Sequence, residues 1–279
     1  MVNAGINKLQ LRIAVYGLIA LLTVIFVYPF VLTVINSLNP LKSLPTLLPT
    51  AFNWENYKLA VTMIEFPAFL KNSLIICAIY VPLTTISSAL AGFGFARLNA
   101  PGKKLLFVVI TSTMMLPQIV TQIPTYILFH KLDLINTFIP WLLLGIGGAP
   151  FFIFLYRQFF SSIPRELEEA ARIDGCSTPR MFWTIFLPLA TPATWTTAIM
   201  CFQWTWGDFI TPFMFLKEAN YPLATALATI GYTLPENPKV VFQQPSSAAA
   251  ILFMIPTIAA FFFGQRYLVD GIAAGAVKG

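Results

Sequence analysis

Charge is scarce in this sequence of 279 residues. Asp, Glu, Lys and Arg make up 10% of the chain, whereas a soluble domain carries about 25%, and apolar residues make up 57%. The mean hydropathy is +0.76. This composition excludes a soluble globular fold. Because a helical span needs about 20 apolar residues, the chain has room for about six spans with ordinary loops, and for no large domain beside them.

The side chains that most enzymes use for chemistry are also few. His130 is the single histidine, and the three cysteines, Cys77, Cys176 and Cys201, lie in unrelated contexts with no Cys-x-x-Cys pair. This pattern excludes a zinc knuckle and a disulfide framework. The sequence also lacks the glycine-rich loop that binds ATP phosphates. We therefore expect no catalytic residue, no metal site, no cofactor and no ATPase site on this chain.

Six apolar stretches predict an all-α integral membrane fold with six transmembrane helices, near residues 13–38, 73–95, 105–129, 138–156, 191–216 and 247–267. An even number of spans puts both termini on one side. Of the 17 Lys and Arg residues, six fall on the opposite side, namely Lys42, Lys58, Lys71, Lys131, Lys217 and Lys239. The other eleven lie on the side of the termini. The positive-inside rule therefore predicts cytoplasmic termini, and the net charge of +6 gives no indication of nucleic-acid binding.

Small residues and prolines predict how these spans pack and bend. Ser88, Gly92 and Ala96 recur at every fourth position, a spacing typical of close helix packing in membranes. Prolines inside the later spans are expected to interrupt helical hydrogen bonding, among them Pro117, Pro124, Pro140, Pro150, Pro212 and Pro256. Kinked spans can surround a cavity, and simple bending is the alternative.

The longest predicted cytoplasmic loop, between spans four and five, is unusually rich in charge. Ser162 ahead of Pro164 predicts a helix start, and Gly175 predicts a left-handed residue that ends this helix. Thr178 and Pro179 predict a second start directly afterwards. The loop, residues 161–188, is therefore expected to form a short helix, a sharp turn and a second helix that leads back into the membrane.

This loop carries a recognisable gapped motif, formed by Glu169, Ala170, Ala171, Asp174, Gly175, Ile185, Leu187 and Pro188. Its spacing resembles the EAA signature of the membrane subunits of binding-protein-dependent ABC importers. The surrounding sequence is most similar to MalG-type permeases of carbohydrate importers. Further resemblances are Asn72-Ser73, AGFGFARL at 91–98 and QRYLVDGIAAGAVKG at 265–279.

The resemblance implies that residues 1–279 form a single permease domain with loop 161–188 as a coupling helix on a separate ATPase subunit. It assigns an ion pair to Glu169, a close-contact face to Ala170 and Ala171, and the reversing turn to Gly175. The tail 268–279 resembles the family tail that reaches toward the ATPase dimer, and a solvated tail is an equal alternative.

The resemblance also implies partners and a location. The partners are a second, nonidentical permease subunit, two ABC ATPase subunits that hold ATP and Mg²⁺, and an extracytoplasmic solute-binding protein. The location is the lipid bilayer of the bacterial cytoplasmic (inner) membrane. The implied function is translocation of an oligosaccharide or related sugar by alternating access. Importers of glycerol phosphate and of acidic sugars use similar subunits, so these substrates stay alternatives.

Candidates for the substrate pathway come from polar and aromatic residues within the spans. Asp208 is the one acidic residue in a predicted span, where a charge costs about 2.5–3.5 kcal/mol, so we expect it to face water or a partner. Trp204 and Trp206 can stack on sugar rings, although tryptophan in a span more often packs or anchors at the interface. Hydrogen bonds to sugar hydroxyls are expected from Gln118, Gln122, Thr125 and Gln203.

A secondary transporter driven by an ion gradient is the rival class, with Asp208 as the coupling carboxylate. That class predicts more ionisable residues within the spans than this sequence has. It also leaves the loop motif unexplained.

Overall fold

The structure is a computed structural model that describes residues 8–44, 46–234 and 237–276. Within these residues, four helical segments are long and apolar enough to cross a membrane, or six if two sharply bent helix pairs each count as one span. The helical membrane fold is thus confirmed, while the exact number of six and the cytoplasmic termini stay predictions. The chain divides into two compact units, residues 1–66 with 230–254 and residues 67–229 with 255–279.

The first unit contains α1 (Lys8–Leu38), α2 (Glu55–Thr62), two short strands and the start of α14 (Gln243–Ala276). Asn56 joins α2 to the end of α1, because its amide donates 2.8 Å hydrogen bonds to the carbonyls of Ser37 and Asn39. The hydroxyl of Tyr232 donates to the carbonyl of Ala60 at 2.8 Å. Buried polar side chains thus fix this unit through its loops.

Two short strands, β1 (Thr233–Leu234) and β2 (Asn237–Val241), accompany the helices of the first unit and leave the all-α class unchanged. They pair antiparallel, with Thr233 opposite Val241 and Leu234 opposite Asn237. The β-branched Val240 and Val241 favour an extended backbone, and a proline at position 238 disfavours a helix.

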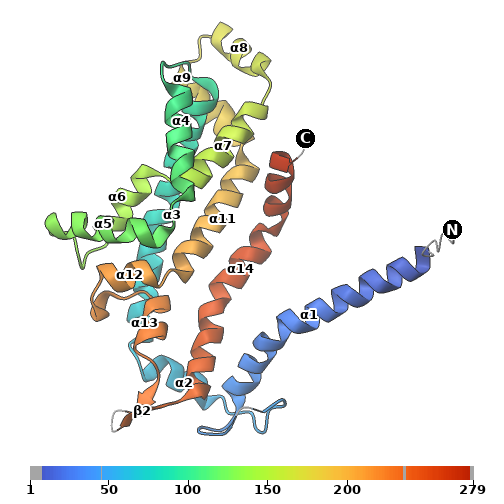
Figure 1. The fold of residues 1–279 in the computed structure, drawn as a ribbon, viewed down its shortest axis with the longest axis vertical. Helices are drawn as coiled ribbons and strands as arrows, with labels where there is room; N and C mark the ends of the chain where they lie inside the picture. The colour runs from blue at the N-terminus through green and yellow to red at the C-terminus, as the bar shows by residue number, and fades with distance from the viewer. Residues whose placement is uncertain (1–7, 45, 235–236, 277–279) are drawn as a thin grey trace, which may run out of the picture. The chain divides into compact units, whose positions relative to one another are not determined.

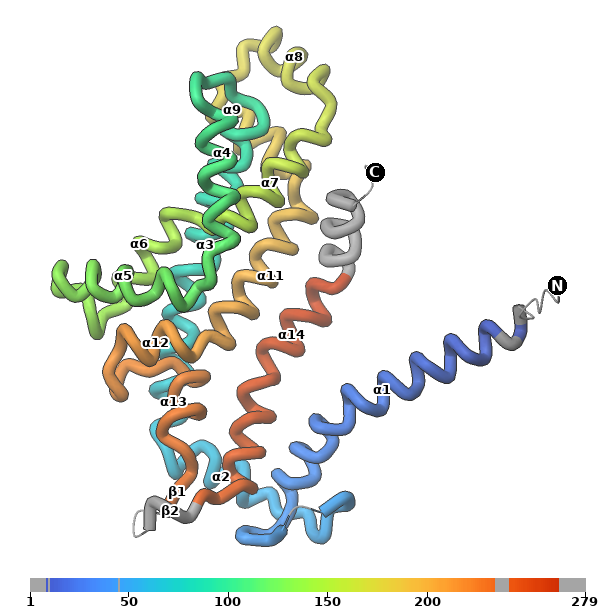
Figure 2. The backbone as a smooth tube through the Cα atoms, in the orientation of Figure 1, coloured from blue at the N-terminus to red at the C-terminus, as the bar shows by residue number. Residues whose placement is uncertain are grey.

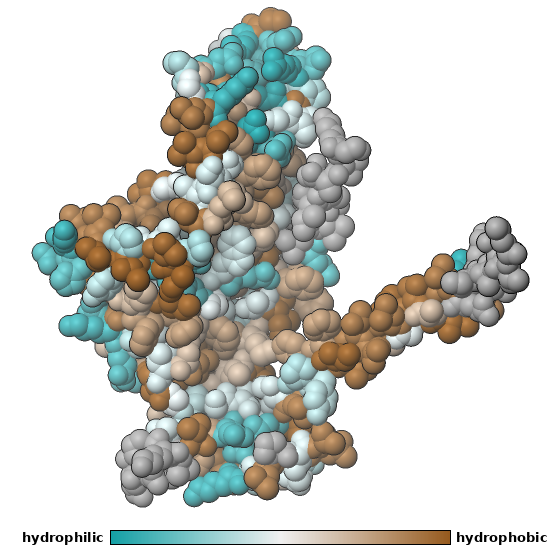
Figure 3. Space-filling view, viewed as in Figure 1, coloured by the Kyte–Doolittle hydropathy of each residue, from teal (hydrophilic) through white to brown (hydrophobic). Residues whose placement is uncertain are grey.

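Apolar side chains cover α1 on all sides, and the segment 11–31 is exposed throughout. Figure 3 shows the continuous hydrophobic colour along this helix. A helix that is apolar all round requires an apolar environment. Its length and composition therefore fit a membrane span.

The second unit begins with α3 (Phe66–Arg97), α4 (Lys103–Ser112) and α5 (Gln118–Lys131), followed by α6 (Ile139–Gly147) and α7 (Pro150–Ser162). Then come α8 (Arg165–Ile173), α9 (Thr178–Met181), a π-helical turn (Phe182–Phe186), α10 (Leu187–Leu189) and α11 (Thr191–Gly207). The remaining elements are α12 (Ile210–Phe215), a 3-10 turn (Glu218–Asn220), α13 (Leu223–Thr229) and the later part of α14. Figure 1 shows α8 beyond the ends of α3, α4 and α7.

Two predicted spans are broken rather than continuous. The third bends by 104° between α4, with its 3-10 extension to Met115, and α5, a turn that is plain in the tube of Figure 2. Pro117 caps α5 at this break, as expected of a residue that cannot continue the preceding helix. The fifth predicted span ends early, because α11 stops at Gly207 and α12 starts again at Ile210. Proline-interrupted helices were expected in both stretches, and Pro117 lies at the first of these two breaks.

A tightly packed aromatic core holds the end of the second unit near α8. Phe93 on α3 contacts the rings of Phe160, Phe182 and Phe186, with centroid distances of 5.0–5.9 Å. Gly92 lies against Tyr156 on α7, and a Cβ added at Gly92 would stand 2.5 Å from the Tyr156 Cβ. The hydroxyl of Ser88 accepts the backbone N–H of Ala149 at 3.0 Å. The predicted packing role of this small-residue stripe is confirmed.

Candidate functional site

The loop between α7 and α11 positions the candidate site, and proline sets where α8 begins. Ile163 and Pro164 are extended, and the ring of Pro164 keeps Ile163 out of the helical region. Ser162 therefore stays in α7, and its hydroxyl donates to the carbonyl of Phe159 at 2.7 Å. The prediction of Ser162 as the helix cap is wrong, since Pro164 holds that position.

The end of α8 confirms the predicted glycine turn. Gly175 has φ of +73°, a left-handed conformation that glycine adopts without strain. The N–H of Cys176 donates to the carbonyl of Ala171 at 2.9 Å, and that of Gly175 to the carbonyl of Arg172 at 3.1 Å. These two bonds form a Schellman motif, which satisfies the last carbonyls of α8.

The segment from the glycine turn to α11, residues 177–189, is called the return arm. It also follows the predicted pattern, with one addition. Ser177 caps α9 instead of Thr178, and Pro179 lies in the first turn as expected. The backbone then widens into a π-helix over Phe182–Phe186 before α10 begins at Leu187. The arm and α11 meet at an angle of 79°.

The two faces of α8 differ in what they contact. Ala171 is buried in the core with Met181 and Phe186. Glu169 and Ala170 are exposed, and Glu169 forms no salt bridge within the residues that the structure describes. The two alanines therefore do not form one exposed face, in contrast to the expectation: Ala171 anchors the helix and Ala170 stays available. Figure 3 shows hydrophilic residues gathered over this end of the molecule.

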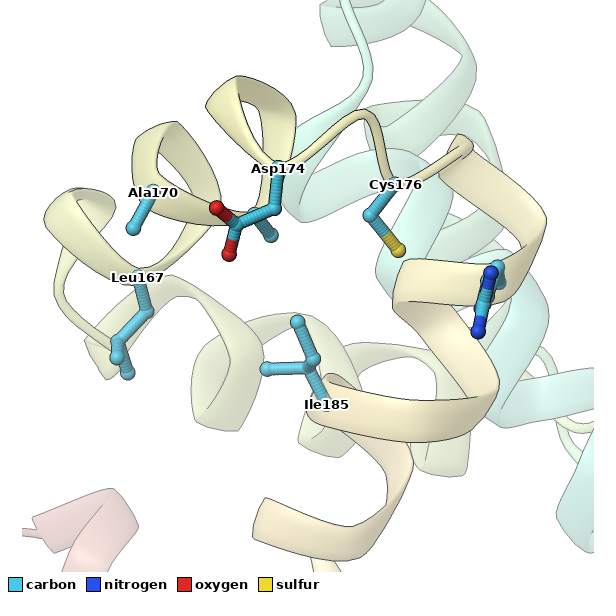
Figure 4. Close-up of a pocket in the computed structure, with 7 residues that line it drawn as sticks. Leu167, Ala170, Asp174, Cys176 and Ile185 are labelled. Atoms are coloured by element: carbon cyan, nitrogen blue, oxygen red, sulfur yellow. The ribbon is translucent and has the colours of Figure 1, made fainter.

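A shallow groove of about 440 Å³ runs between α8 and the return arm. Its lining residues are Leu167, Ala170, Ala171, Asp174, Cys176, Arg180 and Ile185. Figure 4 shows the side chain of Ile185 pointing from the arm toward α8, with Asp174 and Cys176 on the side of the glycine turn. The groove thus has an apolar floor and one acidic and one basic edge. Of the other motif residues, Leu187 packs on the core and Pro188 is exposed.

Arg97, in the last turn of α3, is a residue that sequence reasoning missed. Its guanidinium donates hydrogen bonds to the carbonyls of Phe160 and Ile163 at the end of α7. Its Nη1 lies 3.6 Å from Oε2 of Glu168 on α8. The guanidinium also lies over the ring of Phe186, 5.0 Å from the centroid. No local pattern could have predicted a contact between residues 71 positions apart.

Two of the predicted pathway positions, Gln122 and Asp208, contact Thr211, which the sequence reasoning missed. The amide of Gln122 on α5 donates to the hydroxyl of Thr211 on α12 at 2.9 Å. The backbone N–H of Thr211 donates to Oδ1 of Asp208 at 3.1 Å. The carboxylate of Asp208 thus lies at the break between α11 and α12, where it accepts an N–H at the start of α12.

The remaining pathway candidates have other contacts. Trp204 is half-exposed and stacks on Phe152, with centroids 5.1 Å apart. Trp206 is buried and stacks on Phe202. Thr125 donates its hydroxyl to the carbonyl of Thr121, while Gln203 is half-buried and Gln118 is exposed. A role for these residues in substrate binding stays a prediction.

The part of the chain that the structure describes contains no group of three or more His, Cys, Asp or Glu side chains placed to hold a metal ion. The features of the site are the packing of Ala171 on the core, the charged edges of the groove and its shape. Its geometry suits the binding of another protein surface.

With several long apolar helices, the chain is a multi-pass membrane protein. Residues 85–273 match the family described as the inner membrane component of binding-protein-dependent transport systems. The chain belongs to this family of transport permeases.

Two curated relatives are similar over nearly their whole length. The trehalose/maltose transport system permease protein MalG of Thermococcus litoralis is 30% identical over 93% of this chain and 94% of its own. The maltodextrin transport system permease protein MdxG of Bacillus subtilis is 28% identical over 99% of this chain and 100% of its own.

A solved structure is similar in fold. It is a chain of a bacterial ABC transporter involved in the import of the acidic polysaccharide alginate, with a TM-score of 0.81 and 20% identity. It covers 96% of this chain and 99% of its own.

Proposed function

We propose that the chain is one of two permease subunits of an ATP-driven ABC importer in the bacterial inner membrane. In this proposal it carries no ATPase site, and two separate ATPase subunits hold ATP and Mg²⁺. An extracytoplasmic binding protein delivers the substrate, and the two permeases expose it to each side of the membrane in turn. Loop 161–188 couples these steps to ATP hydrolysis.

One observation carries the coupling role: α8 has an anchored face and a free face. Ala171 is buried on the core, and the neighbouring Glu169 and Ala170 are exposed beside the open groove. One face of this short helix packs on the core and the other face is exposed. Another protein can therefore bind the exposed face without local unfolding of the helix. The acidic Glu169 suits a basic partner side chain, and removing one member of such an interfacial pair costs about 2–5 kcal/mol.

The substrate class is proposed to be an oligosaccharide or related sugar. Support comes from the relatives, whose names specify trehalose, maltose and maltodextrin, and from the half-exposed indole of Trp204. The alginate transporter, which is similar in fold, keeps acidic sugars as an alternative. An ion-gradient mechanism through Asp208 is not favoured, because its carboxylate accepts the backbone N–H of Thr211 in the first turn of α12.

Co-purification with the ATPase subunit and transport of maltotriose into vesicles test the proposal together. In vesicles that hold both permeases, the ATPase and the binding protein, we expect the wild-type chain to retain the ATPase and to support transport only with ATP. We expect Glu169→Lys to lose both. Glu166→Lys is the matched control, because Glu166 is exposed on the same helix and lies outside the motif and the groove. Transport that persists without ATP, together with unchanged ATPase binding by Glu169→Lys, would contradict the coupling role.

A further inference from the structure

The guanidinium of Arg97 lies where three segments of the second unit meet its own helix. From the last turn of α3 it reaches the carbonyl end of α7, the acidic side chain of Glu168 on α8, and the ring of Phe186 in the π-helix. Its side chain is 5% exposed and that of Glu168 is 14% exposed. The contact is therefore an interior junction and not a surface ion pair.

The combination of these contacts suits arginine better than lysine. The planar guanidinium donates to the carbonyls of Phe160 and Ile163 at the end of α7, the first of which also accepts the N–H of Ile163. Its positive charge suits the negative end of the helix dipole. The remaining edge faces the Glu168 carboxylate, and the flat face covers the Phe186 ring. A lysine at this position has one ammonium group and cannot provide the same fork of donors.

A second arginine shares Glu168 but has a different position. Arg172 lies one turn further along α8, and its Nη2 is 2.8 Å from Oε1 of Glu168. Its side chain is 59% exposed, and both partners belong to α8 itself. The Arg172 pair thus supports only its own helix, whereas the Arg97 pair joins α8 to α3 and α7. This difference provides an internal control.

We propose that Arg97 is a positioning residue that fixes α8 on the ends of α3 and α7, so that movement of α8 is passed to these helices as well as along the arm to α11. Along the chain, α8 is connected to α11 only through the sharp Schellman turn at Gly175 and the return arm. The Arg97 junction provides a second, direct connection from α8 to α3 and α7. The coupling consequence rests on the proposed function, whereas the positioning of α8 is a property of this chain alone.

The positioning role is tested on the purified full chain in lipid nanodiscs by distance measurements between two spin labels. Labels are attached to cysteines introduced at Ile173 on α8 and Leu105 on α4, both of which are exposed, in a Cys176→Ser background. We expect one narrow distance distribution in the parent chain, and loss of this narrow peak in Arg97→Gln. Arg172→Gln is expected to leave the peak unchanged, and Arg97→Lys to restore it only in part.

Two further outcomes keep the test decisive. If Arg97→Gln does not fold, Glu168→Gln removes the charge that pairs with both Arg97 and Arg172, and it is expected to broaden the distribution as well. Arg172→Gln separates the two pairs, because it removes the second one alone. A narrow, unshifted peak in Glu168→Gln and in any folded Arg97→Gln would overturn the proposal, as would equal broadening in Arg172→Gln. Pull-down of the ATPase by the wild-type chain is measured in parallel: failure to bind would contradict the proposed function, while the distance measurements would still decide the role of Arg97.

Discussion

Gly92 brings α3 and α7 into direct backbone contact. An added Cβ would lie 3.0 Å from the backbone nitrogen of Arg157 and 2.5 Å from the Tyr156 Cβ. Neither atom is the end of a flexible side chain, so a larger residue forces the two helices apart. Spacing in the sequence predicts such a contact, but only the structure identifies which helix lies opposite.

Gly92→Ala is therefore expected to lower the free energy of unfolding by about 1–3 kcal/mol, because it overpacks the contact. Gly94→Ala is the matched control on the same helix, where the nearest atom, Cδ1 of Leu98, lies 4.0 Å away. There the better helix propensity of alanine should leave stability equal or raise it by up to about 1 kcal/mol. Thermal unfolding in detergent checks both variants, and equal midpoints for the two would contradict the packing argument.

Asp208 shows how one acidic residue is accommodated in an apolar sequence. Its Oδ1 accepts the N–H of Thr211, at the start of α12, where a negative charge is favourable. The expectation that this residue faces water or a partner subunit stays a prediction, and the sequence could not identify the local backbone group that it accepts from. The rarity of an acidic residue such as Asp208 within a span therefore does not by itself show that the residue is functional.

At the scale of elements, α8 is a helix whose two ends are set by opposite backbone requirements. Pro164 fixes its start by excluding the residue before it from the helical region. Gly175 fixes its end by adopting the left-handed conformation that the Schellman motif requires. The helix between them is only nine residues long, so its stability depends on these ends and on the buried Ala171.

Gly175→Ala should therefore loosen the end of α8. A left-handed alanine costs about 1–2 kcal/mol, which corresponds to roughly tenfold faster local opening. Hydrogen exchange of the segment 165–181, followed by mass spectrometry, measures this opening in the intact chain. Gly175→Asn should exchange at an intermediate rate, because asparagine tolerates this conformation better. If the Gly175→Ala variant and the wild-type chain exchange hydrogen at the same rate in this segment, the left-handed residue does not control the end of α8.

The sequence predicted the elements of this site better than their contacts. The glycine turn at Gly175 and the break at Pro117 follow from local backbone chemistry, which a short stretch of sequence contains. The junction of Arg97 with Glu168 depends on α3 and α8 meeting in space, and no periodicity contains that information. The burial of Ala171 beside the exposed Ala170 was missed for the same reason, because helical spacing alone does not show which face meets the core.

At the scale of the whole molecule, the side of the membrane on which α8 lies decides whether the coupling proposal can hold. The native cysteines provide the means to measure it. Cys176 lies beside the glycine turn and lines the groove, whereas Cys77 and Cys201 are buried in helices. A membrane-impermeant maleimide thus has one accessible target among them.

We expect this reagent to label inside-out vesicles that contain the chain and to leave sealed right-side-out vesicles unlabelled. The physical reason is the excess of Lys and Arg on the side of α8, which the positive-inside rule places in the cytoplasm. Cys176→Ser should abolish the labelling, and added ATPase subunit should slow it by covering the groove. Labelling of right-side-out vesicles alone would place α8 outside the cell, where no ATPase can reach it, and would contradict both the topology and the coupling role.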